Sequence, residues 1–393
     1  MSQERVIYIN LRNNREKGVV IKMKKLGFGC MRLPMRQGEN ELEVDYEQFN
    51  QMIDAFFKEG FCYFDTAHGY IGGKSETAIR DCLVKRYPRE SYILTDKLTS
   101  SYFQKEEEII PLFERQLENT GVEYFDYYLM HALNSDYYAK YVECHAFEVA
   151  RQLKAEGRIR HIGISFHDKA AVLDKILSEQ PDIEVVQIQF NYADYDDPGI
   201  ESYLCYQVCE KHNKPVIVME PVKGGGLVNL PKAAEIILDE HRKGASYASY
   251  AIRFCASFDK VFMVLSGMST IGQMEDNLSY MKDFVPFTDD EFELIGHIRE
   301  IIKNQDMIPC TACRYCVDGC PVHIAIPDLF ACYNAKKQYN DWNSDVYYSV
   351  STKDAGAASD CIKCGKCEKV CPQHIKIRLN LEDVSEMFEK NRQ

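Results

Sequence analysis

Short apolar runs alternate with amphipathic stretches of helical period from Lys24 onward, and this rhythm constrains the fold more than any other feature. Such alternation is typical of a parallel sheet whose strands are connected by helices. The apolar runs are Lys25–Met31, Phe61–Ala67, Tyr92–Lys97, Phe125–His131, Ile159–Ser165, Val185–Asn191, Val216–Met219 and Val261–Ser266. Examples of the helix-like segments between them are Asp45–Lys58, Lys74–Arg86, Glu106–Asn119 and Tyr138–Glu156.

Eight βα units within about 260 residues match the usual size of a (β/α)8 barrel, or TIM barrel, which is the predicted fold. A doubly wound open sheet is the alternative. When such a sheet binds a dinucleotide, it carries a GxGxxG motif after its first strand, and no such motif follows Lys25–Met31. The sequence therefore favours the barrel.

The length of 393 residues suits one large domain and a smaller one. Residues 24–303 form the predicted barrel domain, which ends in a helix over FTDDEFELIGHIREII with Thr288 as its N-cap. Residues 1–23 are predicted to form a hairpin or a poorly ordered extension. From Ile308 on, cysteine, proline and polar residues replace the strand pattern, so residues 304–393 are predicted to form a separate small domain.

Charge and hydropathy exclude several classes of protein. The net charge of −13 argues against nucleic acid as a partner, because phosphate binding requires a basic surface. No run of about 18 apolar residues occurs, so no membrane span is expected. The N-terminal residues contain no apolar stretch typical of a secretory signal, and we expect a cytoplasmic protein.

Half of the 16 cysteines are scattered through the chain. A disulfide framework usually belongs to a short secreted protein, so we expect the scattered cysteines to be buried thiols in a reducing cytoplasm. These are Cys30, Cys62, Cys82, Cys144, Cys205, Cys209, Cys255 and Cys332.

Four polar residues lie at or just beyond the C-terminal ends of three consecutive predicted strands, where a barrel carries its catalytic groups. They are Asp65, Tyr70, Lys97 and His131. Carbonyl reduction requires a hydride donor and a proton donor, and a tyrosine with a pKa near 10 needs help at neutral pH. A lysine ammonium would lower the pKa of Tyr70, Asp65 would hold Lys97, and His131 would orient the carbonyl.

Each of these residues also has a structural explanation when it is considered alone. Asp65 and Lys97 would make an ordinary ion pair in the barrel mouth, and a single histidine is more often structural than catalytic. The sequence contains 25 tyrosines. The four residues together, in register on consecutive strands, favour the functional interpretation.

The barrel segment resembles the aldo-keto reductase family. The resemblance is carried by FDTAHGY, Lys-Ser-Glu at residues 74–76, ILTDKL, DYYLMH and HIGIS, and it covers roughly Lys24 to Phe284. It implies that Tyr70 donates a proton to a small-molecule carbonyl, with Asp65, Lys97 and His131 in the roles given above. It also implies an NADP or NAD cofactor bound without a dinucleotide-binding fold.

The same resemblance implies a set of cofactor contacts. Ser165 and Gln187 match the positions that hold the nicotinamide carboxamide, and Phe166 replaces an asparagine common in the family. Met219 occupies the position of an aromatic residue that stacks on the nicotinamide, and the glycine-rich segment that follows is in a place where barrels commonly bind phosphate. The full set of predicted contacts is Ser165, Gln187, Met219, Lys223, Gly224, Gly225, Ser266, Gly267, Gln273, Asp276 and Asn277.

The choice between NADP and NAD depends on two of these positions. Family members specific for NADP place Lys and Arg against the 2′-phosphate, where this sequence has Gly267 and Gln273. Neither residue can pair with a phosphate as a cation would. Asp276 and Asn277 match the adenine contacts of the family.

The other eight cysteines form two copies of one motif, Cys310-x2-Cys313-x2-Cys316-x3-Cys320-Pro321 and Cys361-x2-Cys364-x2-Cys367-x3-Cys371-Pro372. This is the spacing of two-cluster ferredoxins, in which the fourth cysteine of each motif ligates the other cluster. It predicts two 4Fe–4S clusters, one held by Cys310, Cys313, Cys316 and Cys371 and the other by Cys361, Cys364, Cys367 and Cys320. Zinc is the alternative metal.

The resemblance to ferredoxin-like dicluster domains covers about Asp306 to Ile377. Nicotinamide transfers two electrons as hydride, whereas each cluster transfers one. The clusters are either structural or exchange electrons with a redox partner such as a flavoprotein or a ferredoxin. The predicted function is an NAD(P)-dependent oxidoreductase of the aldo-keto reductase type; the alternative is a cofactor-binding electron-transfer or regulatory subunit without carbonyl turnover.

Overall fold

The computed structural model describes residues 23–38, 42–197, 200–303, 307–310, 314–339, 343–353, 355–371 and 373–390. The predicted hairpin or extension over residues 1–23 lies outside this part of the chain, apart from Met23. The chain divides into two compact units, each described here by itself. The first contains residues 1–196, 200–221 and 248–288, and the second contains residues 197–199, 222–247 and 289–393.

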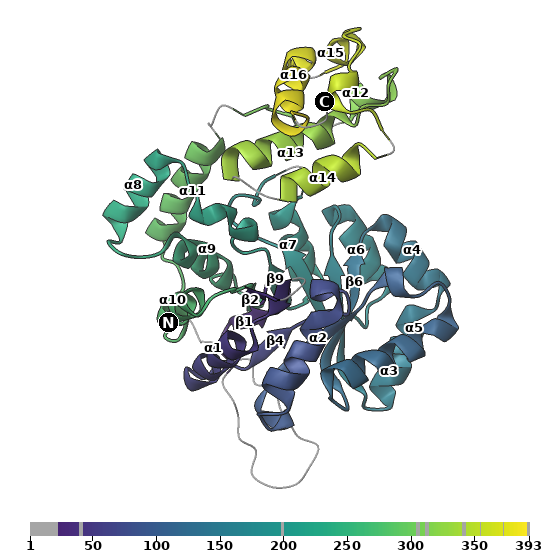
Figure 1. The fold of residues 1–393 in the computed structure, drawn as a ribbon, viewed down its shortest axis with the longest axis vertical. Helices are drawn as coiled ribbons and strands as arrows, with labels where there is room; N and C mark the ends of the chain where they lie inside the picture. The colour runs from purple at the N-terminus through teal and green to yellow at the C-terminus, as the bar shows by residue number, and fades with distance from the viewer. Residues whose placement is uncertain are drawn as a thin grey trace. The chain divides into compact units, whose positions relative to one another are not determined.

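The first unit is a closed barrel of eight parallel strands, as the sequence predicts (Figure 1). Each strand pairs with its neighbours along the chain, and the first strand closes the barrel by pairing with the last. The strands are β1 (Leu26–Gly29), β4 (Tyr63–Asp65), β5 (Ile93–Leu98), β6 (Phe125–Leu133), β7 (Ile159–Phe166), β8 (Val185–Gln189), β9 (Val216–Met219) and β10 (Val261–Ser266).

Helices follow the barrel strands. They are α1 (Tyr46–Lys58), α2 (Lys74–Ile79), α3 (Ile109–Thr120), α4 (Ser135–Glu143), α5 (Ala146–Ala155), α6 (Ala170–Glu179), α7 (Ser202–Lys211), α9 (Tyr247–Ala256) and α10 (Ile271–Met281). The predicted helix over Tyr138–Glu156 is two helices, because His145 adopts a left-handed conformation with a φ of 51° and interrupts the hydrogen-bond ladder. An antiparallel pair, β2 (Met35–Gln37) and β3 (Leu42–Val44), was not predicted.

Large side chains fill the interior of the barrel. Tyr63, Ile93, Tyr127 and Leu129 belong to this buried cluster, and a glycine in β7 makes room for it. A Cβ atom on Gly163 would lie 2.5 Å from both Leu129 Cδ2 and Val185 Cγ1. The close approach, and not a turn, explains why this strand contains a glycine.

The second unit is helical in the described residues, and its core surrounds most of the motif cysteines. Its elements are η6 (Lys223–Val228), α8 (Lys232–His241), α11 (Asp289–Lys303), α12 (Tyr315–Asp318), α13 (Ile326–Tyr339), α14 (Asn343–Ser351), η7 (Ala358–Asp360), α15 (Lys366–Lys369) and α16 (Ile377–Phe388). Ile324, Leu329, Phe330 and Leu381 lie in the core, with Cys316 and Cys367. Residues 222–247 and 289–303, which the sequence analysis assigned to the barrel, cluster with this unit. Within the described part of the chain, no helix is both long enough and apolar enough to cross a membrane.

Candidate active site

Strand alternation directs three of the four predicted catalytic side chains into the barrel. Successive residues of a strand point to opposite faces, so residues two apart share a face. Tyr63 lies in the barrel interior, and Asp65 follows it on the same face. In the same way, Lys97 follows the interior residue Ile93, and His131 follows the interior residue Leu129.

Lys97 connects the predicted catalytic residues. Its ammonium Nζ donates to Asp65 Oδ1 at 2.6 Å, to the Thr66 carbonyl oxygen at 2.7 Å and to the Tyr70 hydroxyl at 3.2 Å. Lys97 is fully buried, and Asp65 is buried beside it. Three acceptors arranged around one ammonium hold its position, and the one farthest from Nζ is the phenol oxygen of Tyr70.

Tyr70 reaches the site through a turn of unusual backbone conformation. Ile71, Gly72 and Gly73 all have positive φ values, of 54°, 62° and 87°. Such values cost little for glycine but are unfavourable for the β-branched Ile71. The turn is tied to its surroundings by Thr66 Oγ1 and Ser75 Oγ, which lie 2.8 Å apart, and Ser75 Oγ donates to the Cys30 carbonyl at 2.9 Å.

The buried charges set the protonation states of the site. Burial alone would lower the pKa of Lys97. Asp65 and Tyr70 together raise it by more than burial lowers it, so the net shift of the pKa is upward and Lys97 stays charged. Burial raises the pKa of Tyr70, and Lys97 lowers it only in part. Lys97 thus acts in the direction predicted from the sequence, but the loss of hydration, which the prediction did not include, outweighs it.

Two histidines lie at the end of strands β6 and β7. His131 Nδ1 lies 2.7 Å from Thr99 Oγ1, and its ring meets the ring of Tyr70 edge to face at a centroid distance of 5.9 Å. Burial, with Lys97 and His167 as further causes, lowers the pKa of His131 well below its ordinary value, so the imidazole is neutral. His167, which the sequence analysis did not select, donates its backbone N–H to the Leu133 carbonyl at 2.7 Å.

His167 combines surface exposure with a lowered pKa, the first cause of which is burial and the second the charge of Lys97. The signal in the sequence was the position of His167, directly after the predicted contact Ser165 and Phe166. His167 was not predicted, because the predicted contacts include only residues with a counterpart in the family pattern.

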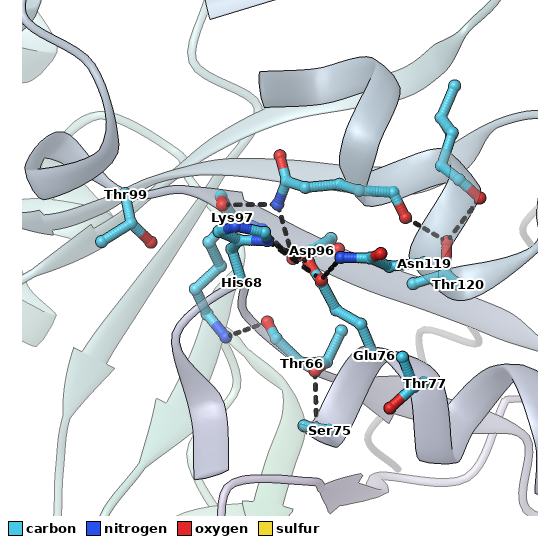
Figure 2. A network of polar contacts seen from close by, with 12 residues as sticks. Thr66, His68, Ser75, Glu76, Thr77, Asp96, Lys97, Thr99, Asn119 and Thr120 are labelled. Atoms are coloured by element: carbon cyan, nitrogen blue, oxygen red, sulfur yellow. Dashed lines mark hydrogen bonds and ion pairs between the residues drawn. The ribbon is translucent and has the colours of Figure 1, made fainter. Parts of the chain in front are cut away.

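A second polar network lies behind Lys97 (Figure 2). Glu76 is fully buried; its Oε2 lies 3.0 Å from His68 Nδ1 and accepts from Asn119 Nδ2 at 2.8 Å. Asp96, also fully buried, accepts from Gln116 Nε2 at 3.0 Å and from the backbone N–H of Lys97 at 2.7 Å. Burial and the nearby Glu76 carboxylate raise the pKa of Asp96 well above its ordinary value. The raised pKa favours the neutral form of Asp96, which spares the strand that carries Lys97 a second buried negative charge beside Glu76.

The predicted nicotinamide contacts Ser165 and Gln187 are buried side by side, because they are register partners on β7 and β8. Gln187 Nε2 lies 3.4 Å from Asp65 Oδ2, which joins these residues to the catalytic group. Gln187 Oε1 is buried and has no hydrogen-bond partner among the described residues. Met219 ends strand β9, next to Gln189 on β8.

The predicted adenosine contacts gather around the end of β10 and the start of α10. Asn277 Nδ2 donates to Ser266 Oγ at 2.6 Å, and both residues are buried. Gln273 Oε1 accepts from the Ser269 backbone N–H at 2.7 Å, so this side chain closes its own loop. Asp276 lies in α10 beside Asn277.

A cation from another loop lies against one of the two predicted phosphate positions. A Cβ atom on Gly267 would lie 3.4 Å from both Cβ and Cδ of Arg32. Ser269 Oγ donates to the Arg32 carbonyl at 3.0 Å and fixes the two loops together. Sequence comparison of the β10 loop alone could not find Arg32, because it follows β1.

The remaining predicted cofactor contacts, Lys223, Gly224 and Gly225, lie in η6 of the second unit. Both glycines have positive φ values, of 65° and 99°. Within that unit, η6 packs against α13. In the structure this glycine-rich segment therefore contacts α13, the helix that follows the first cysteine motif.

The predicted crossed pattern of cluster ligands is reflected in one pocket of the second unit. Cys310 and Cys316 of the first motif line it together with Cys371 of the second, as the prediction requires. Cys313 lies outside the described residues. Within the described residues, no three Cys, His, Asp or Glu side chains are placed to hold a single metal ion. In a 4Fe–4S cluster, each of the four thiolates binds a different iron, so Cys310, Cys316 and Cys371 suit that group.

The second predicted ligand set is Cys361, Cys364, Cys367 and Cys320. Cys364 is exposed, Cys367 is buried, and the other two are partly buried. The short helices α12 and α15, which contain the third cysteine of the first and the second motif, pack against each other. The two motifs are therefore adjacent in the fold.

The scattered cysteines are buried in the described structure, except for the partly buried Cys62. Burial raises the pKa of Cys62 to about 11 and that of Cys82 to about 12. These thiols stay protonated at neutral pH and pack as small apolar groups.

Comparison with known proteins identifies both segments. The sequence model of the aldo/keto reductase family matches residues 25–300, and that of the 4Fe-4S dicluster domain matches residues 309–375. A 4-dihydromethyl-trisporate dehydrogenase of Mucor mucedo is 33% identical over 28% of this chain and 31% of its own. An NAD(P)H-dependent D-xylose reductase of Pachysolen tannophilus is 31% identical over 32% of this chain and 33% of its own. The chain thus spans about a third of the length of these curated relatives.

Solved structures share the barrel fold. An aldo-keto reductase from Bacillus halodurans in its holo form superposes with a TM-score of 0.57 at 24% identity, over 72% of this chain and 93% of its own. An aldo-keto reductase from Klebsiella pneumoniae in complex with NADPH gives a TM-score of 0.57 at 20% identity, over 72% of this chain and 92% of its own. On the family match and the fold together, the chain belongs to the aldo/keto reductase family, and a 4Fe-4S dicluster domain follows its barrel.

Proposed function

We propose that the protein is an NAD(P)-dependent oxidoreductase that reduces a small-molecule carbonyl, or oxidises the corresponding alcohol, at the C-terminal end of its barrel. The observation that carries this proposal is the placement of Lys97 Nζ, which donates at once to Asp65, to the Thr66 carbonyl and to the Tyr70 hydroxyl. A structural ion pair would need only Asp65. The contact with the Tyr70 hydroxyl places the positive charge of Lys97 beside a phenol, where it can stabilise a phenolate.

In this proposal Tyr70 donates its hydroxyl proton to the carbonyl oxygen as negative charge develops there. Lys97 stabilises the phenolate that remains, and Asp65 keeps Lys97 charged and in place. His131, neutral and fixed by Thr99, donates a hydrogen bond to the same carbonyl oxygen. The high pKa of Tyr70 in the free protein makes the phenol the protonated, donating form at neutral pH.

The residues around the catalytic group fit a nicotinamide. Gln187 Oε1 is a buried acceptor without a partner among the described residues, and an unsatisfied buried acceptor is unfavourable. The amide N–H of a carboxamide would satisfy it, with Ser165 alongside on β7. When bound, the nicotinamide supplies or accepts the hydride.

We propose NADP as the preferred cofactor. Arg32 lies against Gly267, one of the two positions where the family's pattern places the 2′-phosphate. A guanidinium can form a bidentate pair with a phosphate, which Gly267 and Gln273 cannot do.

For the second unit we propose two 4Fe–4S clusters that exchange single electrons with a redox partner protein. Cys310, Cys313, Cys316 and Cys371 would hold one, and Cys361, Cys364, Cys367 and Cys320 the other. The described cysteines outside the two motifs are free thiols, which is compatible with a reducing compartment, so we propose that the protein is cytoplasmic.

The test is turnover by the anaerobically purified holoprotein, with its iron and sulfide content measured. The proposal predicts that aldehydes or ketones stimulate the oxidation of NADPH, and of NADH less strongly. The alternative, an electron-transfer or regulatory subunit, predicts that a flavoprotein reduces the clusters while no carbonyl in a broad panel is turned over. That result would contradict the proposed activity.

A further inference from the structure

The segment Cys361–Leu379 of the second unit has a charge opposite to that of the chain. It contains five Lys or Arg residues and one Glu, whereas the whole chain has a net charge of −13. All five cationic side chains are exposed. They are Lys363, Lys366, Lys369, Lys376 and Arg378. Together with the exposed apolar residues Ile362, Val370 and Leu379, they form what we call the basic patch.

The contacts of Arg378 hold this segment together as one surface. Its guanidinium Nη2 donates to Glu368 Oε2 at 2.8 Å, and its Nη1 donates to the Lys363 carbonyl at 3.4 Å. Lys363 Nζ donates to Glu382 at 2.5 Å on α16. The loop of the second cysteine motif is thereby fixed to the first turns of α16, and α15 packs against both α12 and α16 (Figure 1).

Two cations of the patch are neutralised by these pairs and three are not. Lys363 pairs with Glu382, and Arg378 pairs with Glu368. No ion-pair partner is found for Lys366, Lys369 or Lys376 within the described residues. Three exposed ammonium groups thus lie within the sequence that surrounds Cys364, which is the most exposed of the described motif cysteines.

Apolar side chains interleave with these cations. Ile362, Val370 and Leu379 are 60%, 49% and 54% exposed. Apolar residues surrounded by charged ones are typical of a protein-binding surface, and interfaces of weak redox complexes are small enough to fit such a segment. Single-stranded nucleic acid would require aromatic residues for stacking, and the segment contains no Phe, Tyr or Trp.

From these observations we propose that the basic patch is the docking site of an acidic one-electron carrier protein. The proposal rests on the proposed function of the cysteine motifs as electron-carrying clusters. In each encounter the reduced carrier loses one electron and one cluster gains it, and no covalent bond is made or broken. The exposed Cys364 marks the point of closest approach.

Charge reversal within the patch tests the proposal. Lys366→Glu/Lys369→Glu removes two unpaired cations, and Lys232→Glu/Lys243→Glu changes the net charge equally at two exposed positions on and just after α8. A neutral variant, Lys366→Gln/Lys369→Gln, grades the effect. Iron and sulfide content and the visible circular dichroism of each variant show whether its clusters are intact; Lys376→Glu, farther from the cysteines, replaces any variant that fails this check.

The probes are a reduced bacterial flavodoxin and a reduced plant-type ferredoxin, both acidic. Anaerobic stopped-flow absorbance follows the bleaching of the clusters, and binding is measured separately by isothermal calorimetry. Because steering by opposite charges raises association rates about tenfold or more, Lys366→Glu/Lys369→Glu should slow bleaching at least about tenfold at low ionic strength. The difference should vanish near about 0.5 M salt, where charges are screened within a few ångströms.

Three results would overturn the proposal. The first is equal slowing by the patch variant and by Lys232→Glu/Lys243→Glu. The second is the absence of binding and of bleaching with both carriers. The third is patch-dependent binding of a single-stranded oligonucleotide or of vesicles containing phosphatidylglycerol in place of either carrier. Carbonyl-dependent oxidation of NADPH is assayed on the same samples, so failure of the docking site and failure of the barrel activity are distinguished.

Discussion

Replacing Lys97 by methionine isolates the consequence of burying Asp65 without its partner. In the native structure Asp65 is buried and Lys97 Nζ lies 2.6 Å from its carboxylate. Removing one member of a buried ion pair typically costs about 3–5 kcal/mol, because the remaining charge is neither hydrated nor paired. For Lys97→Met at pH 7 the cost from Asp65 is limited to about 4 kcal/mol, since protonating a carboxyl group of pKa about 3.9 costs about 1.36 kcal/mol per pH unit.

The pH dependence follows from the same argument. In Lys97→Met the folded-state pKa of Asp65 lies above its unfolded value, so the folded state binds the extra proton. The stability lost through Asp65 is therefore absent below about pH 4 and grows as the pH rises toward the folded-state pKa. The double variant Asp65→Asn/Lys97→Met has no carboxyl group at this position and should not show this pH dependence.

The assay is a double-mutant cycle of Asp65→Asn, Lys97→Met and the double variant. Urea unfolding is followed by circular dichroism at pH 4.5 and pH 7, and hydrogen exchange of β4 and β5 assigns the change to the barrel. We expect the double variant to be more stable than Lys97→Met at pH 7 by about 2 kcal/mol, with a smaller difference at the lower pH. Additive effects within about 0.5 kcal/mol would refute the coupled, buried pair.

Three further predictions follow from other contacts. Because the pKa of His131 lies well below its ordinary value, His131 should stay neutral and cause no fall in kcat/KM between pH 7 and pH 6. A fall in that range that disappears in the His131→Gln variant would place the pKa of His131 there and contradict the neutral state. Arg32→Ala should raise KM for NADPH by about tenfold while leaving KM for NADH almost unchanged, and equal effects would contradict the proposed phosphate contact. Gly163→Ala should destabilise the barrel by about 1–3 kcal/mol in urea unfolding, because the new Cβ would lie 2.5 Å from Leu129 and Val185; an unchanged midpoint would show that the interior accommodates it.

The barrel and the relative positions of Asp65, Lys97 and His131 could be predicted because they depend on simple regularities. Parallel strands end at the same edge, and residues two apart in a strand share a face. Interior residues such as Tyr63 and Leu129 are recognisable in the sequence, so the polar residue two positions later is placed by the same alternation.

The features that could not be predicted depend on contacts between segments far apart in the sequence. Tyr70 is followed by three residues with positive φ values, Ile71, Gly72 and Gly73. Only the two glycines indicate such a conformation in the sequence. Arg32 meets Gly267 across the closure of the barrel, and residues 222–247 cluster with the second unit. The buried pair Glu76 and Asp96 was missed because acidic residues in a helix and a strand read as ordinary surface charges.

The most direct test of the account is Tyr70→Phe, which removes a single oxygen atom and leaves the ring that packs edge to face on His131. Loss of a general acid typically lowers turnover by about 10²–10⁴-fold. The account predicts a fall of this size in kcat for carbonyl reduction, with the dissociation constant of NADPH, measured by fluorescence titration, unchanged. Full turnover by Tyr70→Phe would contradict the assignment of Tyr70 as proton donor and, with it, the catalytic role of Lys97.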